Sequence, residues 1–309
     1  MGAIPTEGRS MNAAVDTITA LQDGLSAGWL DLLGAGITAL PQGLVLGLTN
    51  KEYHSGPGIS KSQLDDIAES PATYIWRKSA PVDEEKLKAL DMGTALHCLL
   101  LEPEEFKDRF IIAPEFNRRT NAGKEEEKEF LANCAELGKT IISFEDDRKL
   151  QLMRESVFAH PDARWLLEQD GICEGSLYWT DRETEELCRC RPDKKLSNFP
   201  ILADVKKVDD MARFERHVEE FRYHVQDAMY SDGFREIYGE VPDFIFLAVS
   251  SSIECGRYPV RVRPLEAEWK ESGKDLYRRD LQKFHECRVN NDWHDLIPLT
   301  RPAWARRAA

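Results

Sequence analysis

Residues 188–206 read CRCRPDKKLSNFPILADVK, and this stretch decides both the expected fold and the expected chemistry. Two strand-like segments are separated by a polar turn, and each carries a carboxylate. Asp193 follows Arg191-Pro192, and Asp204 lies on the next strand. Adjacent strands can bring the two carboxylates onto one metal ion. Lys206 lies two residues after Asp204, so the two side chains share one face of the sheet. We therefore expect two anionic ligands and one ammonium to converge.

Phosphodiester hydrolysis needs these groups. Mg²⁺ prefers carboxylate oxygens and water, and it lowers the pKa of its bound water. A lysine beside the metal can orient or deprotonate that water and stabilise developing charge. We expect Mg²⁺ as the cofactor, with Mn²⁺ as a substitute, and Lys206 as a catalytic group. For an isolated D-x-K pattern an exposed salt bridge is the commoner explanation, but Asp193 and the strand context favour the catalytic one.

The flanking sequence predicts helices around a short sheet. Ser60 is a plausible helix N-cap with Gln63 at the capping-box position, and Pro103 ends a later helix. Further helices are predicted over 87–101, 125–137, 145–160, 210–238 and 265–288. Strands are predicted over 172–179, 187–192, 200–206, 243–250 and 256–263. Helices flanking a short mixed sheet indicate an α/β (α+β) fold.

Composition separates residues 1–50 from the rest of the 309-residue chain. The first 50 residues are rich in Ala, Gly, Leu and Thr, and we predict a short amphipathic helix and a linker there. A partner-binding appendage and partial disorder stay open as alternatives. Asp31, Pro41 and Gln42 interrupt the apolar stretch 29–48, so a membrane span is not expected. Residues 51–309 form the expected globular domain.

Cysteine usage and charge limit the remaining classes. Seven cysteines, an odd number at irregular spacing without a secretory signal, predict reduced thiols in a cytoplasmic protein and no zinc or iron–sulfur site. The net charge of −14 argues mildly against DNA binding, which needs Lys and Arg. An enzyme can still confine its basic groups to one channel and encircle its substrate.

Three motifs together resemble the PD-(D/E)XK nuclease superfamily. Pro192-Asp193 with Asp204-Val205-Lys206 is similar to its signature. Gln226-Asp-Ala-Met-Tyr230 and Gly93-Thr-Ala-Leu-His97 resemble the Q-x-x-x-Y and G-x-x-x-H motifs of its RecB-like branch. The resemblance implies a restriction-endonuclease-like core. It also implies His97, Asp193, Asp204 and the Val205 carbonyl as metal ligands, with Glu174 and Gln226 as further catalytic residues.

The likeness is closer to the C-terminal nuclease domain of RecE-type exonucleases (exonuclease VIII), over about residues 51–305. It rests on residues 53–54, 58–62, 113–128, 188–193, 223–228, 230–233 and 253–259. One departure is Lys207-Val208, where relatives commonly carry small hydroxylated residues. The resemblance implies 5′→3′ digestion of linear double-stranded DNA in prophage recombination and DNA repair. Release of 5′-phosphorylated nucleotides would leave 3′ overhangs for a RecT-like annealing protein. A ring-shaped homotetramer threaded by DNA is also implied.

Several residues have a simpler alternative explanation. Arg118, Arg119 and Lys124 precede a helix N-terminus, which suits phosphate binding, but a solvated loop is the alternative. If the motif is ignored, a buried, hydrogen-bonded histidine explains His97 better than a metal ligand does. For Glu174 the alternative is an internal salt bridge. Tyr230 either contacts DNA or packs. Two other functions stay open: a catalytically silent DNA-binding or assembly module, and an endonuclease on the same fold.

Overall fold

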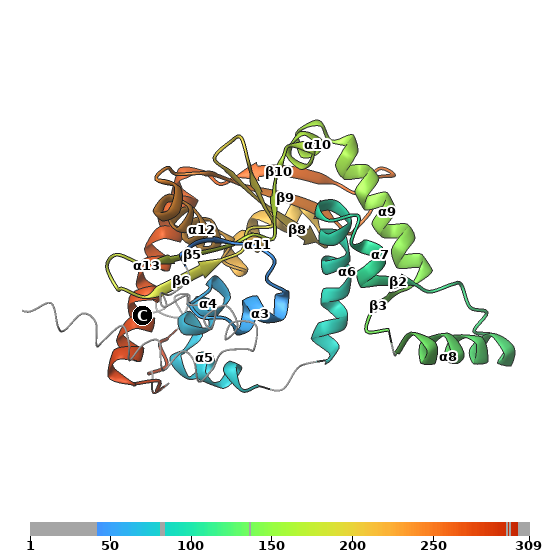
Figure 1. Cartoon of the computed structure of the whole chain (residues 1–309), viewed down its shortest axis with the longest axis horizontal. Coiled ribbons are helices and arrows are strands. Elements are labelled where there is room, and N and C mark those ends of the chain that lie inside the picture. Colours follow the sequence, from blue (N-terminus) through green and yellow to red (C-terminus); the bar gives the residue numbers. More distant parts are fainter. Residues whose placement is uncertain (1–41, 81–83, 136, 295, 297, 302–309) are drawn as a thin grey trace, which may run out of the picture.

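The computed structural model describes residues 42–80, 84–135, 137–294, 296 and 298–301 (Figure 1). Its helices are α3 Asn50–Ser55, α4 Lys61–Glu69, α5 Pro71–Lys78, α6 Glu84–Leu101, α7 Phe106–Arg109, α8 Asn121–Ala135, α9 Phe144–Ala159, α10 Pro161–Glu168, α11 Phe214–Glu220, α12 Tyr223–Tyr238 and α13 Ala267–Asn290, with a 3-10 turn over Met211–Arg213. Its strands are β1 Gly43–Val45, β2 Phe110–Ile112, β3 Thr140–Ile142, β4 Gly171–Cys173, β5 Ser176–Thr180, β6 Leu187–Cys190, β7 Lys194–Leu196, β8 Ile201–Val208, β9 Asp243–Ser250 and β10 Val260–Pro264.

A mixed sheet with the strand order β10-β9-β8-β7-β4 forms the centre of the molecule. Strands β8 and β9 run parallel, whereas β10–β9, β7–β8 and β4–β7 are antiparallel. Both β8 and β9 are rich in apolar residues and mostly buried, as expected for strands covered on two faces. The mixed sheet flanked by helices confirms the predicted α/β (α+β) class.

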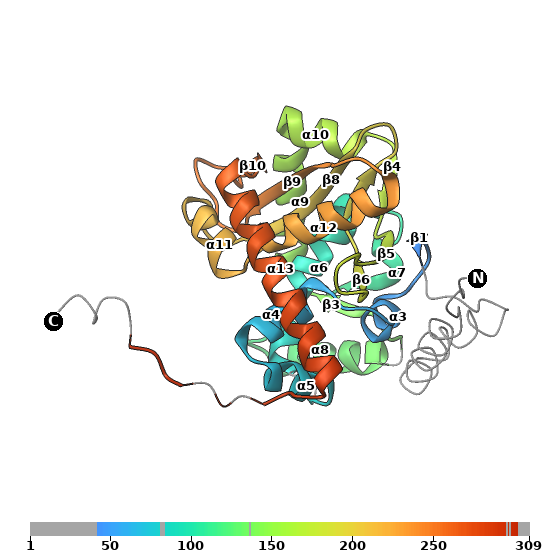
Figure 2. The ribbon, with the colours of Figure 1, turned by 90° about the vertical axis from the view of Figure 1, so that its left-hand side faces the viewer.

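Helices cover both faces of this sheet (Figures 1 and 2). On one face, α6 and α9 pack against Val205 and Leu247 in a shared apolar cluster. On the other face, α11 and α12 pack against Leu202, Val208 and Phe246. Because side chains alternate along a strand, residues 204 and 206 have the same parity as Leu202 and Val208 and point towards α12. Asp204 and Lys206 therefore lie on the α12 face of β8.

A smaller sheet, β1-β5-β6, lies beside the central one. Gly43–Val45, which lies within the segment predicted as an appendage, pairs antiparallel with β5. Arg191 fixes this entry segment by donating to Ser176 Oγ, Asn50 Oδ1 and the Leu48 carbonyl. The helix predicted in the appendage lies outside the described residues. None of the described helices combines the length and apolar character needed to cross a membrane.

The structure corrects two predicted elements. The predicted strand 172–179 is two strands, β4 and β5, which belong to different sheets and separate at Glu174-Gly175. The predicted helix 210–238 is broken at Phe221-Arg222, where Arg222 adopts the left-handed conformation with φ 54°. The capping box of Ser60 and Gln63 is confirmed, and α4 begins at Lys61. All seven cysteines lie in the described part of the chain, and none forms a disulfide.

Candidate metal centre and catalytic residues

The site is built on an open edge of β8. Strand β7 pairs with β8 only at Leu202 and Ala203, so the Val205 backbone has no strand partner on that side. Two side chains bind it instead. The Val205 N–H donates to Asp193 Oδ2 at 2.6 Å, and the Val205 carbonyl accepts from His97 Nε2 at 2.7 Å. The divergence of the strands therefore positions both side chains.

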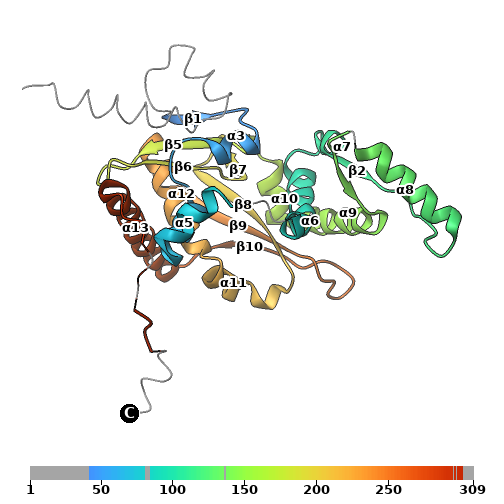
Figure 3. The same cartoon turned by 90° about the horizontal axis from the view of Figure 1, so that it is seen from below.

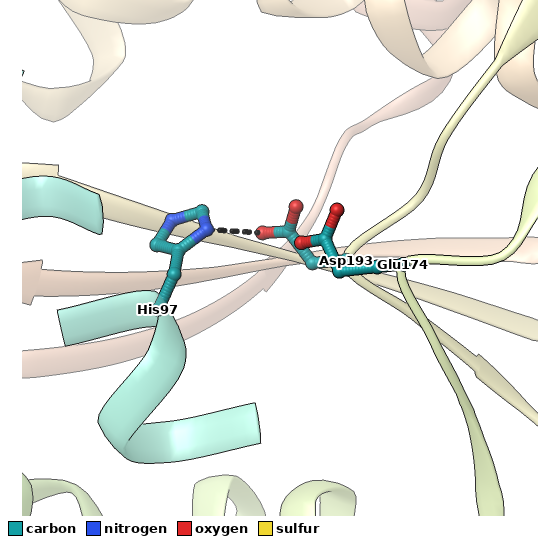
Figure 4. Close-up of side chains that lie close together, drawn as sticks. All are labelled: His97, Glu174 and Asp193. Atoms are coloured by element: carbon teal, nitrogen blue, oxygen red, sulfur yellow. Dashed lines mark ion pairs between the residues drawn. The ribbon is translucent and has the colours of Figure 1, made fainter. Parts of the chain in front are cut away.

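The hydrogen bond of His97 also fixes its tautomer. A carbonyl oxygen can only accept, so Nε2 must carry a hydrogen. Nδ1 then faces the carboxylates and lies 3.5 Å from Asp193 Oδ2 (Figure 4). A backbone carbonyl that holds one ring nitrogen while the other faces an anionic cluster is the usual arrangement of a metal-binding histidine. The Val205 carbonyl accepts this hydrogen bond from His97, and its predicted coordination of the metal stays a prediction.

Glu174 completes the cluster. One ligand atom each from His97, Glu174 and Asp193 lies within 4.8 Å of the others, as Figure 4 shows. Glu174 reaches this position from the break between β4 and β5, where its φ is 52°. Its N–H donates to the Asp193 carbonyl at 3.1 Å, which fixes the break against the next strand. A non-glycine residue in this conformation is uncommon and often marks a functional site.

The cluster concentrates negative charge that the protein only partly neutralises. Burial and the neighbouring Asp193 raise the pKa of Glu174 from 4.5 to about 7. Burial and Asp204 raise the pKa of Asp193 from 3.8 to about 6, although His97 and Lys206 oppose this. One imidazole nitrogen and two carboxylates with raised pKa values fit a divalent cation, which would offset their repulsion. The residues present therefore suit the metal that the sequence predicts.

Asp204 and Lys206 form the second half of the site, on the α12 face of β8. Lys206 Nζ lies 2.6 Å from Asp204 Oδ2, and Gln226 donates from Nε2 to Asp204 Oδ1 at 2.5 Å. The ammonium also lies over the Tyr223 ring, 4.5 Å from its centroid. Burial lowers the pKa of Lys206, but Asp204 and Asp193 outweigh burial, and the net shift is upward. Lys206 is therefore held as a cation.

Of the four predicted DNA-binding residues, Tyr230 is the one that shares an element with a residue of the site, since it lies on α12 one turn after Gln226. Arg118 pairs with Glu127 through both Nε and a terminal nitrogen, and Arg119 and Lys124 are exposed. They border or belong to α8, which projects from the body away from α12 and α13 (Figures 1 and 3). Tyr230 is partly buried and packs edge-on against Phe244. DNA contacts by these four residues stay predictions.

Sequence reasoning missed a charged network beside the site. Arg222, at the break before α12, bonds Asp280 and lies 3.5 Å from Asp65. Lys61 Nζ lies 2.7 Å from Asp65 and donates to the Phe221 carbonyl at 2.7 Å. These residues come from α4, from the turn before α12 and from α13, and no local pattern indicates that they meet. Lys61 lies within the segment 58–62 that carried part of the resemblance, but no role was predicted for it.

Comparison with known proteins agrees with this architecture. A family model described as a PDDEXK-like domain of unknown function (DUF3799) matches residues 60–295. The chain belongs to this PDDEXK-like family. A crystal structure named as a "Putative exonuclease" from Eubacterium rectale is similar in fold, with a TM-score of 0.55 and 12% identity. The match covers 86% of this chain and 99% of that one. No curated protein matches.

Family membership confirms the PD-(D/E)XK superfamily that the motifs indicated, and the structural neighbour agrees in fold alone at this identity. The signature residues Asp204 and Lys206 lie on β8, the middle strand of the central sheet, and Asp193 directly precedes β7, at the point where these two strands diverge. The family description assigns no activity.

Proposed function

We propose that this protein is a metal-dependent nuclease that degrades linear double-stranded DNA from its 5′ ends. One observation carries the proposal: a three-ligand cluster lies beside an aspartate–lysine pair on one open strand edge. A structural salt bridge explains an aspartate–lysine pair by itself. It does not explain why His97, Glu174 and Asp193 gather at the same edge with two carboxyls of raised pKa.

His97, Glu174 and Asp193 would hold the metal, and Asp204 is the expected fourth protein ligand. A bound divalent cation supplies charge neutralisation at the phosphate and a more acidic bound water. Mg²⁺ is the proposed physiological ion because most of these ligands are carboxylate oxygens, and Mn²⁺ is proposed as a substitute that also accepts imidazole.

The chain's own residues prepare the reaction. Asp204 holds the Lys206 ammonium at the strand edge, and Gln226 fixes Asp204 from the other side. Lys206 then positions the attacking water and stabilises charge that develops on the phosphate. Its packing against Tyr223 restricts the rotamers of a long side chain, so less entropy is lost when substrate binds.

The finer assignment extends the RecE-type resemblance. We propose release of 5′-phosphorylated nucleotides, 3′ overhangs for recombination by strand annealing, a homotetrameric ring around the DNA, and a RecT-like annealing protein as partner. The clustering of all the signature residues supports an active enzyme over a catalytically silent DNA-binding or assembly module. The same residues serve endonucleases of this fold, so the experiment must separate exonuclease from endonuclease.

The test is digestion of linear duplex DNA with Mg²⁺, using 5′-labelled and 3′-labelled substrates in parallel and closed circular plasmid beside them. We expect early release of the 5′ label, intact plasmid and no reaction by Lys206→Ala. Cleavage of the plasmid would show an endonuclease. Absence of metal-dependent release from either end by folded protein would refute the proposal and favour the silent module.

A further inference from the structure

The turn between α11 and α12 presents an exposed aromatic ring close to Lys206. Phe221 is 53% exposed. Its ring centroid lies 5.3 Å from that of His217 and 5.8 Å from that of Tyr223. Tyr223 in turn lies beneath the Lys206 ammonium, with Nζ 4.5 Å from the ring centroid. Two successive contacts thus connect the exposed ring of Phe221 with the cation of the site.

The turn that carries Phe221 is held by side chains of two other helices, α4 and α13. Arg222 takes the left-handed conformation, which is unfavourable for a residue with a side chain. Ion pairs with Asp280 on α13 and Asp65 on α4 stabilise it. Lys61 donates to the Phe221 carbonyl at 2.7 Å. The exposed ring therefore stands on a fixed backbone, which is what a substrate-binding platform requires.

Packing does not require an aromatic ring at this position. A single exposed apolar side chain is ordinary on a protein surface, so exposure alone decides nothing. The α11–α12 side of the core is filled by Phe214, Val218, Tyr223 and Phe246, and Phe221 is not a member of that cluster. Phe221 differs from other exposed apolar residues in its position, because it lies on a rigid turn close to Lys206 and its ring is exposed to solvent.

We propose that Phe221 stacks on a nucleobase of the DNA end and so positions the neighbouring phosphate at Lys206. The inference rests on the proposed nuclease function and adds a contact with the substrate. Every nucleobase has a π face, so stacking accepts all four bases, as an exonuclease that advances along any sequence needs. Loss of such a contact weakens binding by roughly 5- to 100-fold.

Three substitutions test the ring itself. Phe221→Trp keeps an aromatic face, whereas Phe221→Leu keeps apolar volume without one, and Phe221→Ala removes both. We expect KM for linear duplex DNA to rise by roughly 5- to 100-fold in the Ala and Leu variants and to stay within about threefold in the Trp variant. Trp165→Ala is the matched control, since Trp165 is 42% exposed on α10, where it contacts Phe199 rather than the site.

An abasic substrate separates stacking from a structural role. With the terminal nucleotides replaced by abasic residues, wild type should lose the affinity that Phe221→Ala loses on intact DNA, and the variant should lose nothing further. Equal KM values for wild type and Phe221→Ala on intact DNA would overturn the proposal. The proposal would also be overturned if Phe221→Ala bound abasic DNA more weakly than wild type does, by the same factor as on intact DNA.

Two further measurements keep the outcome independent of the nuclease proposal. Stabilisation by Mg²⁺ or Mn²⁺ in thermal melts should be the same for Phe221→Ala and wild type, because Phe221 touches none of the three clustered ligands. DNA affinity measured in a Lys206→Ala background tests stacking without cleavage. If wild type binds DNA through Phe221 but does not cleave it, the nuclease function is refuted and the stacking proposal stands.

Discussion

Replacing Asp193 by Asn should stabilise the protein when metal is withheld by a chelator. Burial and repulsion by Asp204 raise the pKa of Asp193 from 3.8 to about 6, and the Asp193 carboxylate in turn raises the pKa of Glu174. Asn keeps an oxygen that can accept from the Val205 N–H, so the strand-edge hydrogen bond survives. The substitution removes the charge and little else.

The sign and size follow from linkage. Between pH 3.8 and about 6 the folded state binds more protons at Asp193 than the unfolded state does, so the free energy of unfolding falls as pH rises. Above about pH 6 the free energy of unfolding is lowered by the full amount that the ionised Asp193 costs. A shift of about two pKa units corresponds to at most roughly 3 kcal/mol. A gain of 1–3 kcal/mol corresponds to a rise in Tm of roughly 2–10 °C for a domain of this size.

The assay is thermal unfolding of wild type and Asp193→Asn with EDTA at pH 8 and at about pH 4. We expect the variant to melt higher at pH 8, with the difference shrinking towards pH 4 and added Mn²⁺ stabilising only wild type. Asp181→Asn is the control. Burial raises the pKa of Asp181, but hydrogen bonds from Arg278 and Thr184 outweigh burial and lower it, so its loss should destabilise at pH 8. An Asp193→Asn protein that melts lower than wild type at pH 8 in EDTA would refute the reasoning.

Three further predictions concern the lysine, the metal and the core. Lys206→Ala should lower kcat by a factor of roughly 10²–10³ or more, whereas Mn²⁺ should still stabilise the variant in thermal melts. Loss of that stabilisation would contradict the assignment of the metal ligands. Metal binding should release about one proton at pH 6.5, because Glu174 and Asp193, with pKa values of about 7 and about 6, together carry about one proton at that pH. Calorimetry of metal binding in buffers of different ionisation enthalpy measures the number of protons released. Gly273→Ala should destabilise by several kcal/mol in denaturant unfolding, since an added Cβ would lie 2.1 Å from the His224 carbonyl oxygen. Gly93→Ala on α6, where an added Cβ meets nothing within 4 Å, should instead be neutral or stabilise by up to about 1 kcal/mol.

The Asp204–Lys206 pair was predictable because its pattern is local. Asp204 and Lys206 lie on a long apolar strand with a period of two, and Asp193 closely precedes that strand. The i, i+4 spacing of Gln226 and Tyr230 indicated a shared helix face, and Gln226 does reach Asp204. Strand β9 is likewise a continuous apolar run, and its predicted bounds match the structure.

The parts that the sequence did not reveal depend on backbone turns at residues that rarely adopt positive φ. Glu174 and Arg222 both adopt positive φ although neither is Gly or Asn, the residues that usually indicate such turns. Apolar residues continue on both sides of each break, so periodicity predicted an unbroken strand and an unbroken helix. Contacts from distant segments stabilise these conformations: the Asp193 carbonyl for Glu174, and Asp65 and Asp280 for Arg222.

The most direct test of the central claim is anomalous diffraction from crystals of the protein grown with Mn²⁺. We predict one strong peak at ligand distance, roughly 2.0–2.3 Å, from His97 Nδ1 and from carboxylate oxygens of Glu174 and Asp193, and no such peak in crystals of Asp193→Asn. A fully occupied Mn²⁺ site elsewhere, with this cluster free of metal, would contradict the assignment of the site and the nuclease mechanism built on it.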